Sequence, residues 1–273
     1  MRILPSLILF LGIGLIIPTV YYLIFRKRAL LDKIPARVWA ITGLIAFIFF
    51  PAFLFRKHWE RALVFAKNTF WFVAGVAQMD NNFWETLAKL LVIVIFILLT
   101  RDTGKEIFKR KSSSLIFGYW AGLCYGIGEA ITLSIIGYFP VLNRVFGINL
   151  FMYFTTWYAV WERAYAIQIH AIIGALVGLG FYHWFGLAKR GWLLFFFIVG
   201  ILYHELVDGL VLVMMYYPRQ GFSKFISTNI LTITLPVLLV IGYLILFIAY
   251  RASKNVLRSQ ELTCIGEKSE IRS

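Results

Sequence analysis

Ionisable residues lie inside long apolar segments of the chain, and four of them form a set of interest: Glu129, His170, His204 and Asp208. An ionisable side chain inside a membrane-spanning helix costs several kcal/mol, so such a residue is either functional or paired with a partner. His204 and Asp208 are four residues apart, which places them side by side on one face of a helix. Carboxyl and imidazole groups that share a hydrated cavity can activate water and stabilise an oxyanion. These residue types therefore indicate acid–base chemistry, and hydrolysis above all.

Glycines accompany these groups at helical spacing. Glu129 follows a series of glycines spaced four residues apart, three residues after its last member. His170 and His204 each belong to a series with the same four-residue spacing. The glycines of these faces are Gly118, Gly122, Gly126, Gly174, Gly178 and Gly200. Small residues repeated in this way let another helix backbone approach closely. We therefore expect Glu129, His170 and His204 to point into helix–helix contacts and to meet in one polar cavity.

The composition indicates that a membrane surrounds these segments. Of the 273 residues, 61% are hydrophobic and only 15% are charged, and the mean hydropathy is +0.81. A soluble domain carries about a quarter charged residues. The net charge of +14 comes from short basic blocks between apolar runs, which is typical of topology signals rather than of nucleic-acid binding. Cys124 in an apolar run and Cys264 in a polar tail do not form a disulfide scaffold.

Apolar runs long enough to span a bilayer predict an all-α helical bundle of about eight transmembrane helices. The expected spans are 3–25, 38–55, 62–80, 86–100, 115–139, 163–186, 191–217 and 227–250. Residues 1–250 are thus expected to form one membrane-embedded domain, and residues 251–273 a cytoplasmic polar tail. Between two spans, residues 140–162 suit a loop and an interfacial helix, since Trp157 and Trp161 favour the membrane–water boundary. Counting Lys and Arg by loop predicts that both termini are cytoplasmic.

Three blocks carry a resemblance to a known group of enzymes. They are Tyr-Gly-Ile-Gly-Glu-Ala at 125–130, Glu-Arg with a histidine seven residues after the arginine at 162–170, and His-Glu-Leu-Val-Asp at 204–208. In this order they resemble the glutamic-type intramembrane proteases, a superfamily that includes PrsW and the CAAX-processing proteases, and most closely the YhfC family. The resemblance implies a membrane-embedded peptidase that acts on a membrane protein or a membrane-proximal peptide.

The first motif of that superfamily is a pair of glutamates followed by a basic residue. The best match here is Arg-Asp-Thr-Gly-Lys at 101–105, in which one acid of the pair remains, and 106–109 is a rival match. The resemblance then implies that Asp102 is the base and that Lys105 orients it. An aspartate is one methylene shorter than a glutamate, and misplacement on the order of 1 Å can cost about a hundredfold in rate.

The resemblance also implies roles for the other ionisable residues. Glu129 shares or relays the proton, while His170 and His204 stabilise the tetrahedral intermediate, and Asp208 belongs to the same catalytic group. Three neighbouring residues are expected to support these groups from outside: Glu162, Arg163 and Glu205.

Other functions stay open at this point. The second hypothesis is a relative that keeps the fold, lacks activity and binds membrane proteins, which the incomplete glutamate pair favours. A transporter that relays protons or ions is a third possibility, although the sequence shows no internal repeat. No cofactor is expected. A divalent metal bound by Glu129, His170, His204 and Asp208 is the alternative, since residues 204–208 have the spacing of the HExxH motif with Asp as the last residue. Lipids are expected partners, nucleic acid is not, and the oligomeric state is not indicated.

Overall fold

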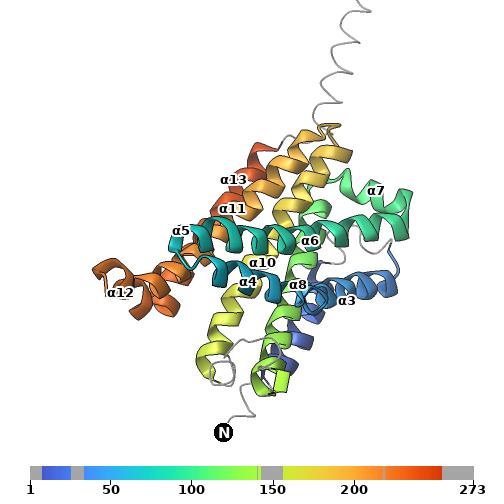
Figure 1. Cartoon of the computed structure of the whole chain (residues 1–273). Helices are drawn as coiled ribbons and strands as arrows, with labels where there is room; N and C mark the ends of the chain where they lie inside the picture. The colour runs from blue at the N-terminus through green and yellow to red at the C-terminus, as the bar shows by residue number, and fades with distance from the viewer. Residues whose placement is uncertain (1–7, 26–33, 140, 143–155, 218, 254–273) are drawn as a thin grey trace, which may run out of the picture.

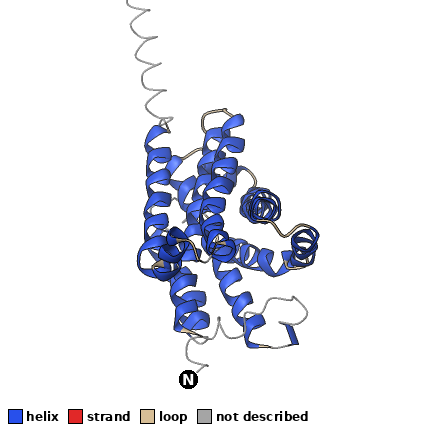
Figure 2. Ribbon diagram, turned by 60° about the vertical axis from the view of Figure 1, so that its left-hand side comes forward, coloured by secondary structure: helices blue, strands red, loops and turns tan. Residues whose placement is uncertain are grey.

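The computed structural model describes residues 8–25, 34–139, 141–142, 156–217 and 219–253, and every regular element among them is helical. Figure 2 shows helices joined by short connections. The α-helices are α2 (Ile17–Phe25), α3 (Ala36–Phe53), α4 (Arg56–Ala66), α5 (Phe70–Phe72), α6 (Met79–Thr100), α7 (Asp102–Phe108), α8 (Lys111–Tyr138), α10 (Trp157–Phe185), α11 (Gly191–Tyr216), α12 (Gly221–Thr228) and α13 (Leu235–Ala252). Short π-helical stretches at Leu9–Ile16, Val73–Gln78 and Ile230–Thr234 precede α2, α6 and α13.

The centre of the molecule is the pair α8 and α10, which run side by side while α6 crosses them (Figure 1). These two helices are the most enclosed apolar segments. In their most apolar 18-residue stretches, 89% and 78% of the residues are buried, against 22% in the segment that contains α13. α3 packs on α8, and α11 and α13 pack on α10. Any polar group on α8 or α10 that faces another helix therefore lies inside the bundle.

Six helical segments of the described chain are long and apolar enough to cross a membrane. They are Ala36–Ala66, Phe70–Thr100, Lys111–Gly137, Trp157–Phe185, Gly191–Tyr216 and Ile230–Ala252, and a shorter apolar helix covers Gly12–Phe25. The prediction of an apolar, all-helical fold is thus confirmed for these residues. The count of eight spans is not confirmed: the expected third and fourth spans do not form two separate helices, and the expected first span is described only in part, as the shorter helix Gly12–Phe25.

The polar stretch around residues 78–85 caused this difference. The sequence places a break between 80 and 86, where Asp, Asn and Glu lower the local hydropathy. The structure instead continues one helical segment over Phe70–Thr100. No proline or glycine interrupts residues 76–100, and the polar side chains of this stretch are satisfied by neighbouring helices, as described below. Residues 62–66 of the expected third span belong to α4.

Three other expectations concern the connections and ends. Trp157 and Trp161 are exposed, and they lie in the first turns of α10 rather than in a separate interfacial helix. Most of the expected loop before them, and residues 254–273 of the expected tail, fall outside the described residues. The cytoplasmic location of the termini stays a prediction, since it depends on the number of spans.

Candidate functional site

A glycine seam fixes how α8 lies against α10. A β-carbon added at Gly118 would lie 2.9 Å from the Cα of Gly178, and one added at Gly126 would lie 2.9 Å from the Cα of Ile167. As the residue numbers of these contacts increase along α8, those of their partners decrease along α10, so the two helices are antiparallel. Gly122 lies between them, against the backbone of His170. The seam therefore brings the next turn of α8, with Glu129, onto the turns of α10 that carry His170 and Arg163.

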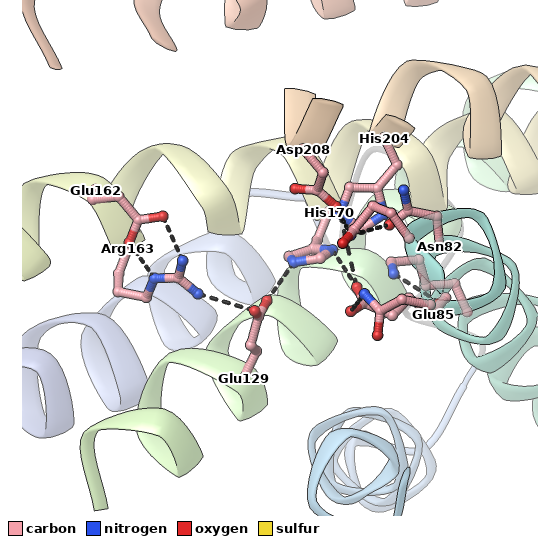
Figure 3. Close-up of polar contacts among 11 residues, drawn as sticks. Asn82, Glu85, Glu129, Glu162, Arg163, His170, His204 and Asp208 are labelled. Atoms are coloured by element: carbon pink, nitrogen blue, oxygen red, sulfur yellow. Dashed lines mark hydrogen bonds and ion pairs between the residues drawn. The ribbon is translucent and has the colours of Figure 1, made fainter. Parts of the chain in front are cut away.

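Glu129 contacts both of these α10 residues. Its Oε1 lies 3.0 Å from Nη1 of Arg163, and its Oε2 lies 2.5 Å from Nε2 of His170. Arg163 also binds the carboxylate of Glu162, with its Nε 2.5 Å from the nearer oxygen. The four side chains form a continuous chain of contacts along the α8–α10 interface (Figure 3). Glu129 and Arg163 are almost enclosed, with side-chain exposures of 14% and 11%.

Glu85, on α6, extends this chain to a third helix. Its Oε2 lies 3.7 Å from Nδ1 of His170 and 3.8 Å from Nε2 of His204 on α11. The two imidazole rings are nearly perpendicular, with centroids 5.0 Å apart. All three side chains are buried. The structure thus brings together one carboxylate and two histidines from three helices (Figure 3).

The polar residues of α6 hold the acids of α11. Gln78 donates a hydrogen bond to Oδ2 of Asp208 at 2.6 Å, and Asn82 donates one to Oε2 of Glu205 at 2.8 Å. Oδ2 of Asp208 is also 3.5 Å from Nε2 of His204. Partner positions increase along α6 as they decrease along α11, so these helices are antiparallel too. A β-carbon at Gly200 would make an ordinary 3.5 Å contact with Cγ2 of Thr86 on α6 and a tighter 3.2 Å contact with Cγ2 of Ile173 on α10.

Glu85 has further polar neighbours on its own helix. Asn81 donates a hydrogen bond to its Oε1 at 2.8 Å. The side chain of Lys89 is fully buried, donates to the backbone oxygen of Glu85 at 2.8 Å, and places its ammonium 3.9 Å from the centroid of the Tyr125 ring. A cavity of about 10 Å³ lies between Glu85, Asn81, Tyr125 and Arg56. That volume suits about one water molecule.

Asp102 and Lys105 are not part of this cluster. They lie on α7, pair with each other at 3.2 Å, and have side-chain exposures of 93% and 49%. The rival pair Glu106 and Lys109 is exposed as well. Thr100, where α6 ends, is fifteen residues beyond Glu85, or about 22 Å along the helix axis. The backbone then turns at Arg101, whose φ is 51°, so α7 leaves the direction of α6.

The remaining expected residues lie where their spacing predicts. Glu129, His170, His204 and Asp208 belong to one network, with Arg163, Glu162 and Glu205 at its edges. Gly174 and Gly178 face α8, where β-carbons would clash with the backbone at Gly118, Gly122 and Ser114. The roles assigned to these residues remain predictions, because contacts alone do not show catalysis.

The sequence analysis missed the contribution of α6. Asn81, Glu85 and Lys89 recur every four residues, so they form a polar stripe on one helix face, and Gln78 and Asn82 lie beside it. This periodicity is the signal that could have identified them. The expected spans 62–80 and 86–100 instead leave Asn81, Asn82 and Glu85 in a connection, because the hydropathy is low there.

No protein-family model, curated protein or solved structure matches this chain. Membership of the YhfC family or of its superfamily therefore rests on the three sequence blocks and remains a prediction. What the cluster can do must be argued from its own chemistry. A buried carboxylate flanked by two imidazoles can either take a proton from water or bind a metal ion that acidifies water.

Proposed function

We propose that this protein is a multi-pass membrane hydrolase that cleaves a peptide bond in a membrane-embedded or membrane-proximal substrate. The observation that carries this proposal is the position of Glu85 between His170 and His204, inside a bundle of apolar helices. Each of these three residues comes from a different helix. Such convergence needs the whole fold, and burial of these groups is costly unless they are paired or used.

Hydrolysis in an apolar environment requires an activated water molecule and groups that stabilise the developing oxyanion. The cavity of about 10 Å³ beside Glu85 has room for about one water molecule, and it lies on the side of Glu85 that Asn81, Arg56 and Tyr125 line rather than between the two histidines. His170 is oriented by Glu129, which Arg163 holds in turn. Catalytic side chains must be held to within a fraction of an ångström, and this chain of contacts supplies such support.

The substrate class follows from the surroundings and from the resemblance. The cluster lies among helices long and apolar enough to cross a membrane, so a substrate within or next to the bilayer has the shortest approach. Asp208 is partly exposed, with 28% of its side chain accessible, and it marks the α6–α11 edge as a side of approach. The three blocks that resemble intramembrane proteases favour a peptide over another acyl substrate.

The test is cleavage by the full-length protein in lipid vesicles. The vesicles would also contain the membrane protein fraction of the expression host, and new peptide N-termini would be counted by mass spectrometry. We expect Glu85→Gln to reduce the new termini by at least about a hundredfold, because loss of a general base or a metal ligand has effects of this size. The matched control is Glu106→Gln, an exposed acid on α7, and it should cleave like the wild type.

Two outcomes would overturn the proposal: equal cleavage by wild type and Glu85→Gln, or no new termini from the wild type. The second outcome bears on another candidate. The exposure of Asp102 favours a relative that keeps the fold and binds membrane proteins without cutting them. Such a protein would retain membrane proteins from the same vesicles after detergent extraction but generate no new termini.

A further inference from the structure

We propose that Glu85, His170 and His204 bind a single divalent transition metal ion, with zinc as the best match. The inference deepens the proposed hydrolase function and concerns the same cluster. One potential ligand atom from each residue lies within 4.8 Å of the other two. Oε2 of Glu85 is 3.7 Å from His170 Nδ1 and 3.8 Å from His204 Nε2. A point equidistant from atoms spaced in this way is at most about 2.4 Å from each, close to zinc–nitrogen and zinc–oxygen bond lengths of about 2.0–2.2 Å.

Unsatisfied buried atoms provide an independent observation. Oε2 of Glu85 and Nδ1 of His170 have no hydrogen-bond partner among the described residues, although their side chains are only 8% and 4% exposed. A buried carboxylate oxygen without a hydrogen bond is costly. Both atoms point toward the same small space (Figure 3). A metal ion there would satisfy them together.

The neighbouring contacts orient two of the ligands as metal sites require. Glu129 accepts a hydrogen bond from Nε2 of His170 at 2.5 Å, which leaves Nδ1 as the free lone pair that faces Glu85. Asn81 occupies the other oxygen of Glu85 and leaves Oε2 available. A carboxylate that fixes the tautomer of a ligating histidine is the common arrangement around protein-bound zinc.

The charge of the cluster favours a cation. The carboxylates of the described network outnumber its two cations, Lys89 and Arg163. These carboxylates belong to Glu85, Glu129, Glu162, Glu205 and Asp208. Part of this negative charge is shielded by water, because Glu205 and Asp208 are only half-buried, and the excess of carboxylates over cations favours the uptake of a proton or of a further cation. Two imidazole nitrogens select a transition metal, because magnesium and calcium prefer oxygen ligands.

The donor set also fits a catalytic rather than a structural ion. Two histidines and one glutamate leave the fourth position of a tetrahedral zinc ion open for water. A metal ion there would acidify that water, and Glu85 would serve as a ligand rather than as the base. Asp208, 3.5 Å from His204 Nε2, is then a nearby carboxylate that could accept the proton.

Metal binding can be measured without a substrate. The full-length protein, purified in detergent with its affinity tag removed, would be equilibrated with Zn²⁺ or Co²⁺ alone. The readouts are bound metal per chain and the visible absorption of tetrahedral Co²⁺. We expect about one ion per chain in the wild type and in Glu106→Gln, and at least tenfold weaker binding in Glu85→Gln and His204→Asn. Glu129→Gln, which removes the carboxylate that supports His170 and pairs with Arg163, should weaken binding by about tenfold.

Circular dichroism of each variant would verify that it is folded. Glu85→Asp, which retains a carboxylate, should bind the metal ion more tightly than Glu85→Gln. Less than about a tenth of an ion per wild-type chain would overturn the inference, and so would binding that Glu85→Gln and His204→Asn leave unchanged. Each result is separable from the proposed function. A wild type that binds zinc but cleaves nothing supports only the metal site, and cleavage without bound metal supports only the hydrolase.

Discussion

Replacing Gly122 with alanine tests whether the α8–α10 interface positions the site. A β-carbon at this position would lie 2.8 Å from the Cα of Ala171 and against the carbonyl oxygen of His170. Carbon atoms in contact are normally about 3.5–4.0 Å apart. Both neighbours are backbone atoms, so no side-chain rotation can relieve the clash. The two helices must instead separate by roughly 1 Å.

The expected cost follows from two opposing effects. Overpacking of a rigid interface costs about 1–3 kcal/mol. Alanine stabilises a helix relative to glycine by about 1 kcal/mol. Because both clashing neighbours are backbone atoms, the overpacking cost lies at the upper end of its range, so the net destabilisation of Gly122→Ala is about 2 kcal/mol, which lowers the midpoint of thermal unfolding by roughly 5 °C in a protein of this size. Circular dichroism of the protein in detergent during heating would measure it.

Gly75→Ala is the matched control, because a β-carbon at Gly75 meets nothing within 4 Å. Its unfolding midpoint should equal or exceed that of the wild type. Separation of the helices would also stretch the 2.5 Å contact between His170 and Glu129 toward the limit of hydrogen bonding. We thus expect weaker zinc binding in Gly122→Ala and none of this effect in Gly75→Ala. Equal unfolding midpoints for the two variants would refute the antiparallel register described above.

Two further substitutions test other parts of the site. Arg163→Gln leaves Glu129 and Glu162 without their cation and should destabilise the fold by about 3 kcal/mol, as thermal unfolding would measure. Arg163→Lys should recover part of this loss. An unchanged unfolding midpoint for Arg163→Gln would contradict the buried ion pair. Asp102→Asn should alter peptide cleavage by less than about twofold, since its effect must pass through more than 20 Å of α6. A loss as large as that of Glu85→Gln would instead favour the role that the sequence resemblance implies for Asp102.

The helical elements of the core were largely predictable from the sequence. The expected spans 115–139, 163–186 and 191–217 correspond to α8, α10 and α11, whose bounds differ from them by a few residues at each end. These helices consist of apolar residues at lengths that permit only one regular structure in a membrane. The four-residue period of the glycines on α8 and α10 also indicated correctly which faces are in close contact, because residues without a β-carbon at this spacing let two helix backbones approach each other.

The helix that contributes Glu85 was not predictable in the same way. Averaged hydropathy treats residues 81–85 as a gap between two spans, although Asn81, Asn82 and Glu85 are buried in the structure, where α10 and α11 supply partners for Asn82 and Glu85. The likeness to a glutamate-pair motif drew attention to Asp102 instead. Neither signal predicts the path of the backbone at Arg101, where α7 leaves the direction of α6 and leaves the Asp102 side chain exposed.

The sequence by itself therefore determined which faces of α8, α10 and α11 carry the polar groups and the glycines, since residue spacing fixes position around a helix axis. Only the tertiary structure decided which of these groups meet. That outcome depends on helix order, antiparallel register and crossing, which arise from contacts between residues far apart in the chain. Glu85 lies beside His204, 119 positions later in the sequence, because the α6–α11 and α8–α10 interfaces together bring them to the same place.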